Sequence, residues 1–242
     1  MHLRPYFGLH EPISSLSHLL AATAVAGAYY FLYKKGRGDA LRSSSLLIFS
    51  ASLLFLFCMS GTYHALPPGP WRAFFRRLDY AAIWLVIAGS ATPVHVLLFK
   101  GHWRWGLIAL FWGCALTCLV LVEVYFTRLP YWSIVLGYTG VGSLGLISFS
   151  HLTARYGWKE TTLLFLGGLA YSTGAVIDYL DVPVLIPGVL GPHEIFHFCV
   201  MIGAMLHWWF IYNWADGREP AMIGSRRTAP APAAGIAPLR DT

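Results

Sequence analysis

Seven long apolar segments constrain the fold of this chain more than any other feature. They cover residues 14–33, 44–66, 79–99, 103–122, 131–150, 161–180 and 193–214. A helix of about 20 residues rises about 30 Å, which is the thickness of the hydrocarbon core of a bilayer. Within lipid, every backbone amide must be hydrogen-bonded inside the protein, and a helix satisfies this requirement segment by segment. The sequence therefore predicts an all-α fold, an integral membrane seven-transmembrane helix bundle.

Composition agrees with a chain whose solvent is mostly lipid. Only 12% of the 242 residues are charged and 57% are hydrophobic, whereas soluble domains contain about 25% charged residues. The net charge of +6 arises from Lys and Arg residues between the apolar segments and at the end of the chain, as in membrane-flanking sequences. We therefore expect no nucleic-acid partner.

The chain divides into a membrane domain and a tail. The connections between apolar segments are too short to hold a soluble domain, so residues 1–214 are expected to form one seven-helix unit. Residues 215–242 are rich in Ala, Pro and Arg without a helical period, and we expect this tail to be disordered. Glycines inside the fifth and sixth segments are expected to let neighbouring helices approach closely.

Four ionisable residues lie at the ends of the apolar segments. His64 is near the end of the second segment, Asp79 opens the third, and His193 and His197 open the seventh. When the chain is followed back and forth across the bilayer, all four lie at a similar depth on the side of the N-terminus. Ionisable residues inside membrane helices are costly and indicate function.

The spacing of these residues suggests a metal site. His193 and His197 are four residues apart and so share one helix face, and Ser60 and His64 have the same spacing. Three imidazoles with an open fourth position are typical of catalytic zinc. Asp79 can then orient an imidazole, or it can hold a zinc-bound water and move its proton. Alternatively, Asp79 can simply cap its helix.

Residues 193–197 also match the H-E-x-x-H pattern of zinc peptidases, in which the glutamate is the general base. Nothing else in the sequence is typical of a peptidase. We therefore expect Glu194 to face the loop or solvent at the helix start, where a carboxylate suits the helix dipole. His95, His151 and His207 are interpreted as packing residues, and His18 is left open between packing and the site.

In the order and spacing of these motifs, the chain resembles the progestin and adipoQ receptor family, specifically its bacterial hemolysin III branch. The wider superfamily includes alkaline ceramidases. The resemblance extends to about Trp214. It is carried by Glu11, Ser14, Ser17 and His18, by Ser60-Gly61-Thr62-Tyr63-His64, by Leu78-Asp79-Tyr80-Ala81-Ala82-Ile83, by Ala88-Gly89-Ser90-Ala91-Thr92-Pro93, by Gly167-Gly168 with Tyr171 and Gly174, and by His193-Glu194-Ile195-Phe196-His197.

This resemblance implies roles for individual residues. It implies zinc, rather than iron or copper, bound by His64, His193 and His197. It also implies that Ser60 and Asp79 either support the metal ligands or act in catalysis, with Ser60 donating to a developing oxyanion and Asp79 handling the zinc-bound water. The receptors have Gln where Glu194 stands, which leaves Glu194 out of the mechanism.

The sequence departs from the family pattern at Asp178, where bacterial relatives usually carry an aromatic residue. Asp178 either modifies the site or faces the loop. Orientation also stays open, since the basic residues favour a cytoplasmic C-terminus whereas the family's receptors have a cytoplasmic N-terminus.

Three functions fit these features. The first is a zinc-dependent hydrolase of a lipid amide or ester, in a multi-pass protein of the bacterial inner membrane, with membrane lipids as partners and a lipid substrate entering laterally. The second is a non-catalytic membrane sensor or homeostasis protein, in which structural zinc joins the second and seventh helices. The third is haem ligation by two imidazoles from facing helices.

Overall fold

The computed structural model describes residues 8–218, which form eight α-helices. Their bounds are α1 Pro12–Gly36, α2 Ala40–Ala65, α3 Pro70–Leu98, α4 Gly101–Val124, α5 Tyr131–Ser143, α6 Gly145–Tyr156, α7 Trp158–Leu180 and α8 Pro192–Trp214. Most of the predicted tail, from residue 219 on, lies outside the described residues.

Seven of the helical stretches are long and apolar enough to cross a membrane, which confirms the predicted number. The fifth is made of α5 and α6 together, interrupted only at Leu144. It ends at Tyr156, six residues beyond the predicted end at residue 150.

The third helix begins earlier than the sequence pattern indicated. α3 starts at Pro70, after Gly69, so Asp79 is the tenth residue of the helix. The predictions that Asp79 opens this helix and that it can serve as its cap are therefore wrong. Proline is well suited to the first position of a helix, because its missing N–H has no intrahelical partner there. The first turns of α3 contain Arg72, Arg76 and Arg77, which interrupt the hydropathy pattern there.

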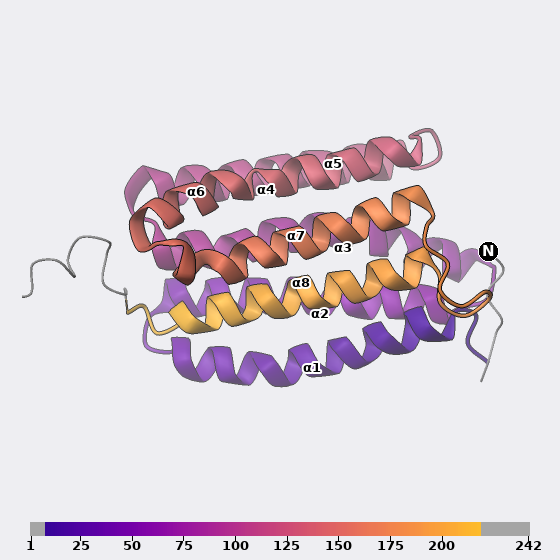
Figure 1. Ribbon diagram of the computed structural model, residues 1–242, viewed down its shortest axis with the longest axis horizontal. Helices are drawn as coiled ribbons and strands as arrows, with labels where there is room; N and C mark the ends of the chain where they lie inside the picture. The colour runs from indigo at the N-terminus through magenta and orange to yellow at the C-terminus, as the bar shows by residue number, and fades with distance from the viewer. Residues whose placement is uncertain (1–7, 219–242) are drawn as a thin grey trace, which may run out of the picture.

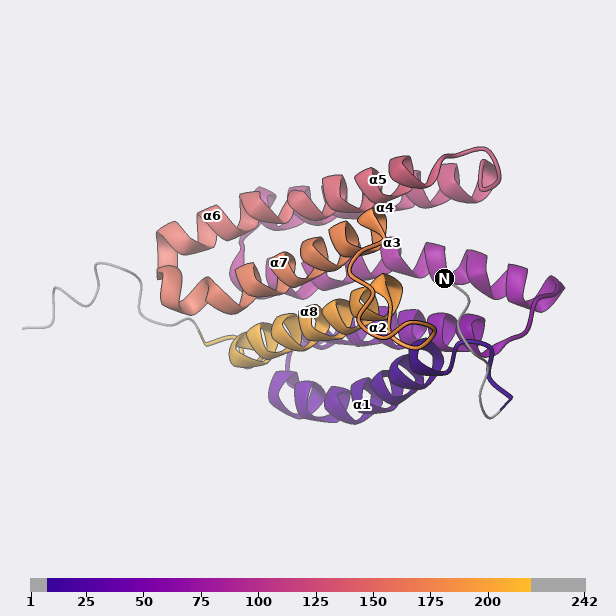
Figure 2. The same ribbon diagram turned by 45° about the vertical axis from the view of Figure 1, so that its right-hand side comes forward.

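The helices lie side by side along the long axis of the molecule (Figures 1 and 2). α2 packs between α1 and α3, α4 packs on α3, and α8 packs on α7 and also contacts α1. α5 and α6 pack against α7. The starts of α1, α3 and α8 and the ends of α2 and α7 consequently meet at one end of the bundle, on the right in Figure 1.

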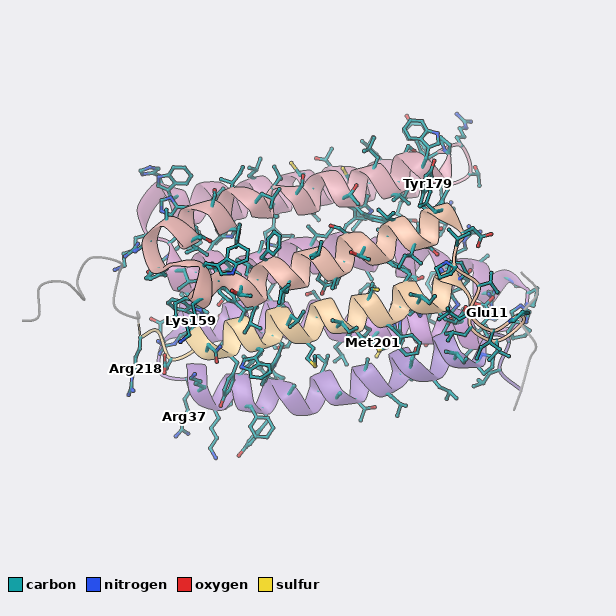
Figure 3. The ribbon with its side chains drawn as sticks, in the orientation of Figure 1. Glu11, Arg37, Lys159, Tyr179, Met201 and Arg218 are labelled. Atoms are coloured by element: carbon teal, nitrogen blue, oxygen red, sulfur yellow. The ribbon has the colours of Figure 1, made fainter. Side chains whose placement is uncertain are left out.

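Apolar side chains both fill the core and cover the outside. One buried cluster joins α1, α2, α3, α6 and α8, and a second one joins α3, α4 and α5 around Trp84 and Phe111. Large apolar side chains such as Leu20, Leu47 and Leu136 are at least half exposed. Figure 3 shows side chains projecting outward from the helices along the bundle. An apolar exterior of this extent fits a surface that faces lipid.

Only some of the glycines in the predicted set make a close helix contact. A Cβ on Gly167 would lie 2.2 Å from Cδ2 of His207, and one on Gly174 would lie 2.6 Å from Cβ of Cys199. These two glycines let α7 approach α8. Gly140 and Gly168, in contrast, have no described atom within 4 Å of such a Cβ, so the expectation of close packing does not hold at those two positions.

Candidate metal centre

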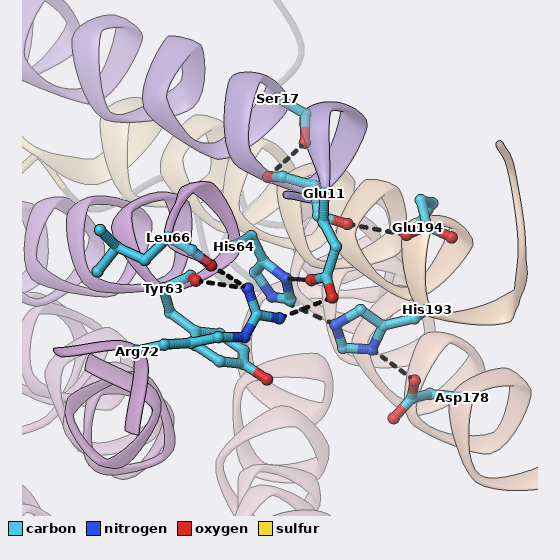
Figure 4. Close-up of polar contacts among 10 residues, drawn as sticks. Glu11, Ser17, Tyr63, His64, Leu66, Arg72, Asp178, His193 and Glu194 are labelled. Carbon is cyan, nitrogen blue, oxygen red and sulfur yellow. Dashed lines mark hydrogen bonds and ion pairs between the residues drawn. The ribbon is translucent and has the colours of Figure 1, made fainter. Parts of the chain in front are cut away.

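Three imidazoles converge at the end of the bundle where α2 ends and α8 begins. His64 comes from the last turn of α2, and His193 and His197 come from the first two turns of α8. One ring nitrogen from each residue lies within 4.8 Å of those from the other two, close enough to hold one metal ion. The predicted convergence of these residues is therefore observed (Figure 4, for His64 and His193).

Two of the imidazoles face each other through the same nitrogen. Nε2 of His64 lies 3.3 Å from Nε2 of His193. Nδ1 of His64 is hydrogen-bonded to the Glu11 carboxylate, and Nδ1 of His193 lies 2.8 Å from Oδ1 of Asp178. A carboxylate only accepts, so each Nδ1 carries the proton, and in the neutral rings both Nε2 atoms present lone pairs to each other.

A shared cation fits this arrangement. Zinc binds imidazole nitrogen at about 2.0–2.1 Å, so two ligands of a tetrahedral site are about 3.3–3.4 Å apart. The Nε2–Nε2 distance of 3.3 Å matches that separation. The carboxylates behind the rings also match the usual support of a metal-bound histidine, which fixes the tautomer and raises the basicity of the ligand.

Glu11 is an element of the site that sequence reasoning noted only as part of the family motif. Its backbone N–H donates to the carbonyl of His64 at 3.0 Å, and Arg72 donates to Oε1 of its carboxylate at 2.7 Å. Burial alone would raise the pKa of Glu11, but its hydrogen bond with His64 and the positive charge of Arg72 lower that pKa to about 2. Glu11 therefore stays ionised and joins the start of α1 to the end of α2 and the start of α3 (Figure 4).

Asp178 belongs to the site and does not merely face the loop. It accepts from His193 and also from the hydroxyl of Tyr131. The question that the sequence left open is thus resolved by contacts from α5 and α8. The signal in the sequence was an ionisable residue close to the end of an apolar segment, on the same side as the histidines.

Glu194 is buried, contrary to the prediction that it faces the loop or solvent. Only 2% of the residue is exposed. Its carboxylate accepts from the Ser14 hydroxyl and from the backbone N–H of Gly191, both at 2.9 Å. Consecutive residues of a helix point about 100° apart, so Glu194 turns away from the histidine cluster towards α1. It caps α8 and joins it to α1.

His18 stacks on the third imidazole of the cluster. Its ring lies 3.9 Å from that of His197 with an interplanar angle of 10°. Both nitrogens of His18, and Nδ1 of His197, are buried without a hydrogen-bond partner among the described residues. His18 therefore lies against the site, although it is outside the group of three that can share an ion.

A cavity of about 430 Å³ opens from the histidine cluster into the bundle. Ser60, Asp79 and His18 line it together with His193 and His197. Ser60 neighbours the Asp79 carboxyl group. The structure thus places the two predicted catalytic residues on the wall of the same cavity as two of the three imidazoles.

Comparison with known proteins identifies the family. The model of the family described as "Haemolysin-III related" matches residues 7–208. The chain belongs to this family. It is 26% identical to "Hemolysin-3" of Bacillus cereus over 172 residues, covering 70% of this chain and 78% of the relative. It is 28% identical to "Hemolysin-3 homolog" of Bacillus subtilis (strain 168) over 173 residues, covering 70% and 81%.

This haemolysin-III related chain is accordingly a multi-pass integral membrane protein, and the relatives named here are bacterial. The matched region includes every residue of the site, from Glu11 to His197. The three-histidine cluster and both of its carboxylate partners are thus part of the family domain.

Proposed function

We propose that this protein is a zinc-dependent membrane hydrolase that cleaves a lipid amide or ester. The observation that carries the proposal is the cavity of about 430 Å³, which extends from the histidine cluster into the bundle and is lined mainly by apolar side chains. Pockets that hold a mostly apolar molecule and orient it with a few polar groups have this composition. A membrane lipid is the ligand that such a cavity, opening within the hydrocarbon layer, is suited to bind.

Zinc is the ion that His64, His193 and His197 suit best, by the neutral imidazole donor set and the 3.3 Å separation of two ligand atoms. When bound by three histidines, zinc polarises a carbonyl group and lowers the pKa of a water to about 7. Glu11 and Asp178 hold the tautomers of His64 and His193 in which Nε2 is free to bind an ion. Both carboxylates would therefore orient the metal ligands, and Asp178 also lines the cavity.

Asp79 and Ser60 supply the remaining roles. Asp79 is positioned at the wall of the cavity to accept the proton of the attacking water and return it to the leaving amine or alcohol. Ser60, which neighbours it, donates its hydroxyl to the oxygen of the substrate carbonyl as negative charge develops there. Both residues lie inside the bundle, so the reaction would proceed with little access to bulk water.

The substrate enters from the bilayer in this proposal. α5 and α7 contribute many of the cavity-lining side chains, among them Val135 and Leu169. A lipid moving between helices would keep its chains in an apolar environment throughout. The reactive carbonyl would then stop at the polar end of the cavity, beside Asp79.

Hydrolysis can be tested with defined lipids. Protein in lipid nanodiscs would be incubated with a long-chain ceramide or a phospholipid, and released fatty acid would be quantified by mass spectrometry. We expect release of fatty acid from the ceramide, whose linkage is an amide, and we expect that release to stop after chelation and to return when zinc is added. Intact zinc without release from either substrate would contradict the hydrolase and favour a sensor in which zinc joins α2 to α8.

A further inference from the structure

A second pair of reactive side chains lies at the opposite end of the same cavity. Nε2 of His95, on α3, is 2.7 Å from Oγ of Ser148, on α6. Both residues line the cavity, and they are 1% and 3% exposed. His95 is 16 residues after Asp79 on the same helix, which places it about 24 Å along α3 from Asp79 at 1.5 Å per residue. The pair is therefore a separate site.

The hydrogen bonds of His95 determine which of its nitrogens is basic. Nδ1 lies 2.7 Å from the carbonyl oxygen of Ala91. A carbonyl oxygen only accepts, so Nδ1 carries the proton and, in the neutral ring, Nε2 presents its lone pair. The Ser148 hydroxyl must then donate to Nε2. This is the arrangement of an activated nucleophile: a hydroxyl bonded to a base that a third group orients.

The surroundings suit an apolar ester. The His95 ring lies 5.1 Å from that of Phe99 and 5.5 Å from that of Phe111, and Phe149 and Phe165 line the same cavity. His95 is one helical turn from the end of α3 at Leu98. This depth is close to the membrane interface, where the ester groups of bilayer lipids lie.

We propose that Ser148 and His95 form a serine–histidine pair that cleaves a long-chain carboxylic ester through an acyl-serine intermediate. Oγ of Ser148 attacks the ester carbonyl carbon while its proton passes to Nε2 of His95. The bond between the carbonyl carbon and the alkoxy oxygen breaks, and the alcohol leaves with that proton. A water molecule then attacks the carbonyl carbon of the acyl-serine and gives a proton to Nε2 of His95. The bond between that carbon and Oγ breaks, the carboxylic acid leaves, and His95 returns the proton to Oγ of Ser148.

The pair can be tested with a long-chain alkyl fluorophosphonate, which reacts with an activated serine by forming an Oγ–P bond and releasing fluoride. Protein in micelles would be incubated with the probe, digested and analysed by mass spectrometry. We expect one probe per chain, attached to Ser148. Folded wild-type protein that stays unlabelled at Ser148 would overturn the proposal.

Variants separate the pair from its surroundings. Ser148→Ala is expected to abolish labelling, and His95→Asn to slow it at least 100-fold, since a positioned base contributes about 10²–10⁴ in rate. Ser150→Ala is the matched control, because Ser150 is exposed and its hydroxyl donates to the carbonyl of Ile147 on the same helix. Its labelling should equal that of the wild type. Equal rates with and without His95 would contradict the role of the histidine.

His193→Ala distinguishes this site from the metal centre. Since the serine–histidine pair does not use the three-histidine cluster, the variant is expected to keep full labelling while losing bound zinc. Failure of the lipid hydrolysis proposed above would leave labelling at Ser148 unaffected. Labelling that disappears together with zinc would show that Ser148 has no independent reactivity.

Discussion

The two ends of the cavity support their histidines with different groups. At the metal centre, His64 and His193 each donate through Nδ1 to a carboxylate. At the other end, His95 donates to a backbone carbonyl and His207 bonds to the carbonyl of Leu164. Both partners fix the orientation of the ring, but a carboxylate raises the basicity of the imidazole more than a neutral carbonyl does, because it carries a full negative charge. The partner of the ring therefore separates His64 and His193 from the two carbonyl-bonded histidines, whereas Nδ1 of His197 has no hydrogen-bond partner among the described residues.

The largest predicted difference between the two ends concerns catalysis at the metal centre. Asp79→Asn removes the proposed proton acceptor, and we expect fatty acid release to fall about 10²–10⁴-fold with zinc content unchanged. Asp181→Asn is the matched control, because Asp181 is exposed beyond the end of α7. Turnover that survives Asp79→Asn would move the catalytic acid–base role to another residue.

The carboxylate support itself is tested by Asp178→Asn. The amide is a weaker acceptor for the Nδ1 proton of His193, so we expect zinc to bind about 10–100-fold more weakly. Affinity would be measured by competition with a chelator, again beside Asp181→Asn. If the affinity for zinc does not change, then it makes no difference to metal binding whether Nδ1 of His193 donates to a carboxylate or to a neutral oxygen.

A smaller effect, on thermal stability, is expected for a substitution near His207, which tests helix packing and not metal coordination. Gly167→Ala would place a Cβ 2.2 Å from the His207 ring, and overpacking of this kind costs about 1–3 kcal/mol. We expect a lower thermal midpoint in micelles with zinc stoichiometry retained. Gly168→Ala, with no described atom within 4 Å, is the adjacent control. Loss of zinc in Gly167→Ala would mean that the two ends are coupled.

Much of the fold could be predicted because hydropathy and helix length are local properties. The number of spans follows from apolar runs, but the start of α3 at Pro70 does not, since its first turns project beyond the apolar stretch. The spacing of His193 and His197 predicts their shared face, and the alternation of spans across the bilayer predicts that His64 meets them.

The remaining site residues depend on contacts that no spacing rule encodes. Glu11 reaches His64 and Arg72 because the chain entering α1 runs beside the loop between α2 and α3. Glu194 is buried because α1, not solvent, lies against that face of α8. Likewise, Gly167 and Gly168 are adjacent glycines that the sequence alone does not distinguish. Only the packing of α8 against α7 determines that Gly167 faces His207 and Gly168 does not.

Metal analysis of purified protein without a polyhistidine tag tests the central claim most directly. Wild-type protein should retain one zinc ion per chain, and so should His102→Ala, in which an exposed histidine at the other end is removed. His64→Ala and His193→Ala should each retain less than about a tenth of that amount, since losing one of three ligands leaves an incomplete site. Equal zinc in all four proteins would contradict the claim that these imidazoles bind one ion.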